Sequence, residues 1–457
     1  MMSFRPPRRP PLASPLASMA LCGLVATALA PAAAVAENRI DAQLPLAPEL
    51  AAYGPLEIGV RPIDLVNPDQ IDIVAIATAP AADPAAPLPT YDRPLRVSVW
   101  HPAYPGATGS RTLPNYLRDG VTLAPLVGRA TRYAAPIEQG GPYPLVIVSH
   151  GYPGNRFLLS HLAENLASKG YVVASIDHTD STYRTLATFG STLRNRTLDQ
   201  LFVLDEMARL NDDPASFLNG LVDVSRTAVV GYSMGGYGAV ISTGAALADT
   251  VYELPFTPPA PTLDIHLEGN EAEVARPDPR VLTAIAIAPW GRNSGMFDAD
   301  SATGISVPML FVAGSEDDVS LYEGGVRDLF EEAVNADRAL LTFDDANHNA
   351  AAPIPAPEES YAFSERLGFY PYEHYADAVW DTARMNNIVQ HFATAWLGKY
   401  LKGETDKDVY LELVESSNDG VRALDEAGEP TEEETYWAGF PDRTAKGLRF
   451  ERLAPGE

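Results

Sequence analysis

The residues with the clearest capacity for chemistry form the run Gly231-Tyr232-Ser233-Met234-Gly235, a G-x-S-x-G pattern. The apolar residues 228–230 before it predict a buried strand, and the small residues after it favour a helix. At a strand–turn–helix junction this pattern predicts a nucleophile elbow, a tight turn that holds the serine hydroxyl at its apex. Gly231 and Gly235 would leave room for that turn. The alternative is a glycine-rich turn in which the serine has no catalytic role. Residues elsewhere in the sequence distinguish the two interpretations.

A serine hydroxyl is a weak nucleophile that needs an adjacent base, and the base needs an orienting acid. After the elbow, the predicted strand 309–313 runs into Gly-Ser-Glu-Asp-Asp, and the predicted strand 339–343 is followed by a loop that contains His348. Parallel strands end at one edge of a sheet, where these residues should meet. We therefore expect Ser233 as nucleophile, Asp317 as acid and His348 as base. Two neighbouring carboxylates remain alternatives for the acid: Asp318 and Glu316.

A tetrahedral intermediate on the serine would need two hydrogen-bond donors aimed at its oxyanion. The backbone N–H of Met234, directly after the serine, is the first candidate. The second is the N–H of Tyr152, in a His-Gly-Tyr turn that follows the apolar run 144–149. Gly151 and Gly154 would let this backbone approach closely, although a plain Gly/Pro turn is the alternative interpretation.

The other histidines are expected to stay outside this chemistry. His178 precedes Ser233 and follows a different predicted strand, so we interpret it as structural or pocket-lining. His161 is predicted to be solvated on a helix, and His374 and His391 have no elbow or carboxylate-bearing strand end beside them. The sequence contains no H-E-x-x-H, EF-hand, P-loop or G-x-G-x-x-G pattern, so we expect neither a metal nor an organic cofactor.

Strands and helices alternate along the chain and would position these residues. The apolar runs predict buried strands at 144–149, 171–176, 228–230, 284–288, 308–313 and 339–343. Helical periodicity predicts helices at 156–169, 198–210 and 377–400. Two earlier strands are expected at 56–65 and 95–100, the second near a sheet edge. This order predicts an α/β fold with a mostly parallel, doubly wound sheet.

We expect one domain over residues 37–457, interrupted by three insertions. Residues 182–196 look irregular. Residues 247–281 and 350–375 are rich in proline and lack strong periodicity, so each is a candidate lid over the strand ends.

Residues 1–36 have the features of a signal peptide: a basic start, an apolar run too short to span a bilayer, and Ala34-Val35-Ala36 as a cleavage site. We expect export to the periplasm or the medium, by either the Sec or the twin-arginine route. The only cysteine, Cys22, lies in this segment. The processed chain would therefore have no disulfide, no cysteine nucleophile and no thiolate metal site.

The chain carries a formal net charge of -27. Such an acidic protein is a poor partner for nucleic acid or anionic lipid. No other segment is apolar enough to cross a membrane, so we expect no integral membrane segment. The oligomeric state is left open.

Motifs spread over nearly the whole of residues 37–457 repeat a known pattern. They are Gly59-Val60-Arg61, LRVSVWHP at 95–102, Val148-Ser149-His150-Gly151, LASKGYVVA at 166–174, Asp177-His178-Thr179-Asp180-Ser181, GYSMGG at 231–236, Ala313-Gly314-Ser315-Glu316-Asp317 and WAGFP at 437–441. Together they resemble the platelet-activating-factor acetylhydrolases and, more closely, the bacterial predicted dienelactone hydrolases of the α/β-hydrolase superfamily. The resemblance implies hydrolysis of short acyl esters, so we expect a small-molecule or lipid ester as the partner.

Residue by residue, the resemblance implies Ser233 as nucleophile, Asp317 as acid and His348 as base, with Tyr152 and Met234 as oxyanion donors. The elbow is also similar to that of bacterial cutinase-like polyester hydrolases, which makes a lipase or a polyester hydrolase the alternative on the same scaffold. A binding protein that kept the fold and lost catalysis is the alternative from another class.

Overall fold

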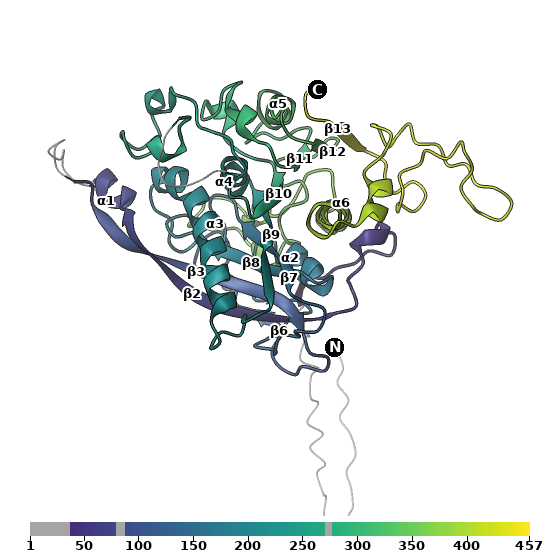
Figure 1. Ribbon diagram of the computed structural model, residues 1–457, viewed down its shortest axis with the longest axis horizontal. Coiled ribbons are helices and arrows are strands. Elements are labelled where there is room, and N and C mark those ends of the chain that lie inside the picture. Colours follow the sequence, from purple (N-terminus) through teal and green to yellow (C-terminus); the bar gives the residue numbers. More distant parts are fainter. Residues whose placement is uncertain (1–36, 79–86, 270–276) are drawn as a thin grey trace, which may run out of the picture. The chain divides into compact units, whose positions relative to one another are not determined.

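A long mixed sheet organises the computed structural model (Figure 1). The structure describes residues 37–78, 87–269 and 277–457, and in this part of the chain ten strands pair in the order β13-β12-β11-β10-β9-β7-β8-β3-β2-β6. The bounds of these strands are β2 Glu57–Ile71, β3 Thr90–Ala103, β6 Thr131–Arg132, β7 Tyr143–Ser149, β8 Val172–Asp177, β9 Val222–Tyr232, β10 Val281–Ile287, β11 Met309–Gly314, β12 Arg338–Phe343 and β13 Leu448–Leu453.

The centre of the sheet, from β8 to β12, is parallel. Strand β3 pairs antiparallel with both β8 and β2, β13 pairs antiparallel with β12, and the short β6 pairs parallel with β2. The carboxyl ends of the parallel strands therefore lie at one edge of the sheet, and the loops that follow them carry the residues of the candidate site. A smaller sheet is formed by three short strands: β1 Asn38–Arg39, β4 Thr112–Leu113 and β5 Leu126–Val127.

Helices cover both faces of the sheet, because its strands are apolar on both sides. In β7, Val146 and Val148 face one core and Leu145 and Ile147 face the other. The first core includes α2 (Ser160–Ser168) and α6 (Thr382–Lys402), and the second includes α3 (Phe189–Asp212), α4 (Met234–Ser242) and α5 (Arg327–Glu332). Figure 1 shows α6 on the opposite side of β9 and β10 from α3 and α4. The short α1 (Ile73–Thr78) follows β2 and contacts α3.

This architecture confirms the predicted α/β fold with a mostly parallel sheet, but several boundaries were wrong. Helix α3 begins at Phe189, so the second half of the stretch 182–196 is helical rather than irregular. Helix α6 begins only at Thr382, because the Asp381 side chain caps it by accepting a hydrogen bond from the N–H of Arg384. Strand β13 was missed altogether, although Leu448 to Glu451 alternates apolar and polar residues.

The other two insertions contain only short 3-10 helices in their described parts. These are η2 Val251–Glu253 and η3 Asp264–His266 in 247–281, and η7 Glu358–Tyr361 and η8 Pro371–His374 in 350–375. Residues 270–276 and the predicted signal peptide, residues 1–36, lie outside the described residues. No helix within the described ranges is long and apolar enough to cross a membrane.

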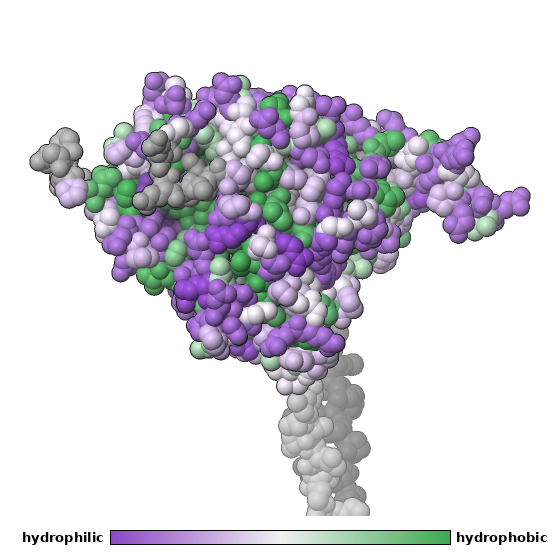
Figure 2. Space-filling model, in the orientation of Figure 1, coloured by the Kyte–Doolittle hydropathy of each residue, from purple (hydrophilic) through white to green (hydrophobic). Residues whose placement is uncertain are grey.

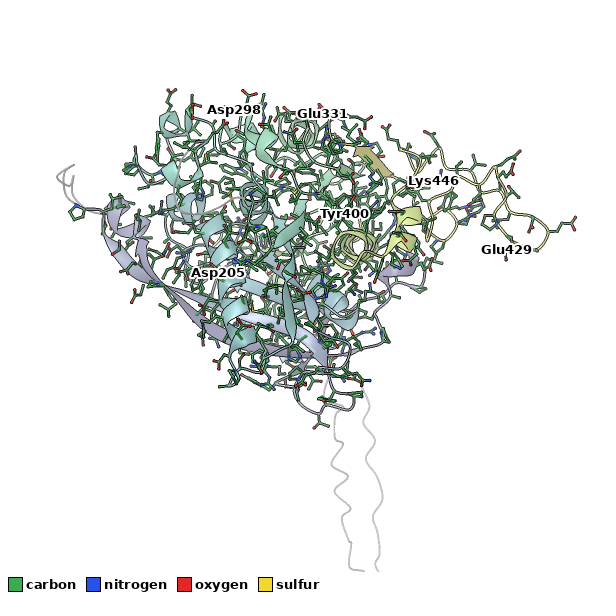
Figure 3. The ribbon with its side chains drawn as sticks, in the orientation of Figure 1. Asp205, Asp298, Glu331, Tyr400, Glu429 and Lys446 are labelled. Atoms are coloured by element: carbon green, nitrogen blue, oxygen red, sulfur yellow. The ribbon has the colours of Figure 1, made fainter. Side chains whose placement is uncertain are left out.

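A polar arm, residues 418–435, extends from the C-terminal part of the chain and is coloured yellow in Figure 1. Figure 2 shows that its surface is largely hydrophilic, and Figure 3 places Glu429 toward its outer end. Six of its carboxylates are exposed: Asp419, Asp425, Glu426, Glu429, Glu432 and Glu433. Part of the protein's negative charge therefore lies on solvent-exposed carboxylates of this arm.

Candidate active site

Ser233 sits between the end of β9 and the start of α4 with φ of 54°. This left-handed backbone is uncommon for a residue with a side chain and is stabilised only by its surroundings. A Cβ atom on Gly231 would lie 2.1 Å from the Gly235 carbonyl oxygen, and one on Gly235 would lie 2.0 Å from the Ser149 carbonyl oxygen. Both glycines are therefore required by the tight turn, as the sequence predicts.

The structure brings Ser233, His348 and Asp317 together. The distance from His348 Nε2 to Ser233 Oγ is 3.0 Å, and that from His348 Nδ1 to Asp317 Oδ2 is 2.9 Å. The carboxylate opposite Nδ1 favours the tautomer in which Nδ1 carries the proton, which leaves Nε2 free to accept from the serine hydroxyl. We call these three side chains the Ser233 array.

The alternative acids do not contact the imidazole. Asp317 follows β11, its side chain is fully buried, and it also accepts hydrogen bonds from the N–H groups of Val319 and Ser320 at 2.9 and 2.8 Å. Asp318 and Glu316 are exposed to solvent. The geometry therefore favours Asp317 as the partner of the histidine.

The two expected oxyanion donors lie beside Ser233. Met234 is the first residue of α4, where backbone N–H groups lack partners within the helix and the helix dipole favours negative charge. A Cβ atom on Gly151 would lie 3.2 Å from Ser233 Cβ, so the turn that carries Tyr152 closely approaches the serine. Among the described residues, neither the Tyr152 nor the Met234 N–H has a hydrogen-bond partner. Both groups are thus available to a ligand.

A pocket of about 640 Å³ opens onto Ser233 and His348. The predicted lid 350–375 contributes Phe369, Tyr372 and His374 to its wall. The predicted lid 247–281 contributes Phe256 to an aromatic cluster beside this pocket. The other members of the cluster are Tyr152, which lines the pocket, Phe189 and Trp290. A second pocket, of about 680 Å³, lies against β2 and β3 and contains none of the Ser233 array.

His374 was missed as a pocket residue, because nothing near it in the sequence signals a site. Its Nε2 lies 2.8 Å from the hydroxyl of Tyr183, and its Nδ1 lies 3.4 Å from Arg118 Nη1. Burial, reinforced by the charge of Arg118, lowers the pKa of His374 to about 3. The uncharged ring of His374 therefore forms part of the pocket wall.

Two other predictions about histidines can be checked. The prediction that His161 is solvated was wrong, because it is 1% exposed and its Nε2 lies 2.9 Å from the Ala352 carbonyl oxygen. His178 is buried, as expected of a structural residue, and it contacts Ser149 and Asp199. Within the described residues, no group of three or more His, Cys, Asp or Glu side chains could hold a metal ion.

Known proteins share this fold and parts of the sequence. A solved structure, the ferulic acid esterase from Streptomyces cinnamoneus, superposes with a TM-score of 0.54, covers 80% of this chain and 94% of its own, and is 21% identical. Residues 126–257 match the family described as "PETase: PET hydrolase-like". The chain has the α/β-hydrolase fold. The matched range contains Tyr152 and Ser233, whereas Asp317 and His348 lie beyond it.

Parts of the sequence are also similar to cutinases. Cutinase est2 of Thermobifida alba is 26% identical over 234 residues, which are 49% of this chain and 61% of the relative. Cutinase 2 of Thermobifida cellulosilytica is 32% identical over 160 residues, 33% of this chain and 53% of its own. The chain thus spans little more than half the length of these relatives. The platelet-activating factor acetylhydrolase of Cavia porcellus is 31% identical over 98 residues, 20% of this chain and 22% of its own, which confirms the predicted resemblance.

Proposed function

We propose that this chain is a serine hydrolase that cleaves short-chain carboxylic esters through an acyl-enzyme intermediate. The observation that carries the proposal is the hydrogen-bonded Ser233 array beside two free backbone donors. Cutinases and an esterase among the similar proteins support an ester as the substrate.

In the acylation step, His348 Nε2 takes the Ser233 proton while Oγ attacks the ester carbonyl carbon. The N–H groups of Met234 and Tyr152 bind the oxygen on which negative charge develops. Asp317, which is buried and hydrogen-bonded to Nδ1, keeps the ring in position and stabilises the imidazolium.

The intermediate then collapses as the C–O bond to the alcohol breaks, and His348 gives its proton to the departing alkoxide. Water next attacks the acyl group on Ser233, with His348 again as base. The carboxylic acid leaves and the serine hydroxyl is restored. No step requires a group beyond the chain, the ester and water.

A cutinase-like polyester hydrolase is the second candidate, because the cutinase relatives and the PET hydrolase-like family match point that way. A series of p-nitrophenyl esters of increasing acyl length, beside a polyester film and a peptide amide, separates the candidates. The short-chain proposal expects kcat/KM to be highest for acetate or butyrate. Release of soluble products from the film together with slow acetate hydrolysis would favour the polyester hydrolase.

A fluorophosphonate probe tests the proposal against an inactive binding protein on the same scaffold. The proposal expects covalent labelling of the purified protein and hydrolysis of p-nitrophenyl acetate. A folded protein that neither labels nor hydrolyses any ester of the series would overturn it.

We also propose that residues 1–36 direct export and that residues 37–457 are one catalytic domain. The basic start, the short apolar run and Ala34-Val35-Ala36 support the first part. Amino-terminal sequencing of the exported protein should begin at Glu37. Retention of the intact chain inside the cell would contradict export.

A further inference from the structure

A second Ser–His–Asp arrangement lies behind the candidate active site. His178 Nε2 is 2.8 Å from Ser149 Oγ, and His178 Nδ1 is 2.9 Å from Asp199 Oδ2. We call these side chains the Ser149 array. Ser149 is the last residue of β7, directly before the turn that carries the candidate oxyanion donor.

The Ser149 array is closed to substrates. Ser149 is fully buried, and the side chains of His178 and Asp199 are each 1% exposed. Arg93 donates to both oxygens of Asp199, at 2.8 and 2.9 Å, so this carboxylate is already neutralised. Burial, reinforced by nearby arginines, lowers the pKa of His178 well below its usual value, which keeps the ring neutral.

The array is connected to the oxyanion turn through the backbone of His178. Its N–H donates to His150 Nε2 at 3.2 Å. Because Nε2 accepts, Nδ1 of the neutral His150 ring carries the proton and donates to the Gly151 carbonyl oxygen at 2.7 Å. Arg196 holds the same turn by donating to the His150 carbonyl oxygen at 3.0 Å.

The orientation of the Gly151 carbonyl determines that of the next N–H. In a trans peptide unit the C=O and the N–H point in opposite directions. The peptide between Gly151 and Tyr152 is not among the cis peptides of the described residues. When the His150 ring holds the carbonyl on one side, the N–H of Tyr152 must therefore face the other side, and this N–H has no partner among the described residues.

We propose that His178 is a positioning residue that, through the His150 ring, fixes the direction of the Tyr152 N–H. The inference rests on the proposed function, because it assumes that this N–H binds the oxyanion. The Ser149 array thus supports the neighbouring site and is not a second catalytic centre. It holds the Tyr152 N–H in the orientation needed to bind the oxyanion before the substrate binds.

The test compares His178→Leu with His178→Asn, whose amide can still donate to Asp199. For the leucine variant we expect kcat to fall about ten- to hundredfold with KM changed less than about threefold, because a misaligned oxyanion donor weakens only the transition state. Its affinity for phenylboronic acid, a tetrahedral transition-state analogue, should fall in step with kcat. The asparagine variant should recover most of both losses. The pH dependence of kcat/KM should be unchanged, since His178 moves no proton.

His391→Phe is the matched control, because His391 is equally buried but lies in α6 among aromatic rings. It should lose stability and keep kcat. If the leucine variant does not fold, Asp199→Asn replaces it and should lower kcat and boronate affinity together. A His178 or Asp199 variant that loses only stability, with wild-type kcat and boronate affinity, would overturn the inference. A wild-type protein without esterase activity would instead refute the proposed function.

Discussion

The Ser233 array and the Ser149 array contain the same three side-chain types at nearly the same distances. The Ser–His separations are 3.0 and 2.8 Å, and the closest His–Asp separation is 2.9 Å in both. Their surroundings differ. Ser233 occupies a left-handed turn at the mouth of a pocket, whereas Ser149 ends a buried strand. The distances within an array therefore do not identify a catalytic centre.

Access and the neighbouring backbone separate the two arrays. The side chain of His348 is 12% exposed and that of His178 is 1% exposed. Free N–H groups lie beside Ser233, and Asp317 has no arginine partner among the described ion pairs, whereas Asp199 is paired with Arg93. Two arrays with similar distances thus differ in accessibility: the Ser233 array can be reached by a ligand, whereas the Ser149 array is enclosed in the core.

The largest expected effect separates the arrays by their serines. Ser233→Ala should lower kcat/KM for p-nitrophenyl acetate by roughly 10⁴-fold, because the hydroxyl proposed to form the acyl-enzyme is removed. The melting temperature should change little. Activity within tenfold of wild type in this variant would remove Ser233 from the mechanism.

The second prediction concerns the acid. Asp317→Asn should lower kcat by about 10³-fold, since the neutral amide no longer stabilises the imidazolium. Asp318→Asn is the matched comparison one residue away. Asp318 lines the same pocket, but among the described residues the carboxylate bonded to His348 is that of Asp317, so kcat should stay within about twofold. The reverse pattern in steady-state kinetics would assign the acid to Asp318.

Buried histidines should affect stability and its pH dependence. Burial lowers the pKa of His161 to about 4 and that of His391 to about 3, whereas in the unfolded chain each titrates near 6.5. The unfolded state therefore binds more protons below pH 6.5, so stability present above pH 6.5 is lost as the pH falls toward 4. Between pH 6.5 and 5 each such histidine accounts for at most about 2 kcal/mol.

Urea unfolding at pH 7 and pH 5 checks this expectation. The loss of unfolding free energy between the two pH values should be smaller in His391→Phe than in the wild type. An identical loss in both proteins would show that His391 does not contribute.

The smallest expected effect is that of Ser149→Ala. Loss of this buried hydroxyl should lower the free energy of unfolding by about 1 kcal/mol and change kcat by less than about threefold, because Asp199 still holds His178. Ser417→Ala, which removes another fully buried serine hydroxyl near β13, provides the control. If Ser149→Ala lost as much kcat as Ser233→Ala, the distinction between a catalytic Ser233 array and a structural Ser149 array would be contradicted.

The sequence was sufficient to predict the parallel centre of the sheet, the elbow turn and the close approach of Ser233, Asp317 and His348. These depend on local signals, since apolar strands and tight turns leave clear patterns and parallel strands end at one edge. Only the four residues Leu448 to Glu451 of strand β13 alternate between apolar and polar, and in the sequence β13 is separated from β12 by more than a hundred residues, so the pattern alone was a weak signal.

Contacts between distant segments could not be predicted. Asp177-His178-Thr179-Asp180 was noticed in the sequence, but the partners of His178 lie on β7 and α3. The burial of His161 and the place of His374 in the pocket wall likewise depend on the path of residues 350–375, which has no periodic pattern. Packing of irregular segments decides these positions.

Mass spectrometry of the fluorophosphonate-treated protein tests the central claim most directly, because it identifies the serine that reacts. We expect one adduct per chain, on the peptide that contains Ser233, no adduct on the peptide that contains Ser149, and no labelling of Ser233→Ala. An adduct on Ser149, or stoichiometric labelling that persists in Ser233→Ala, would contradict the account.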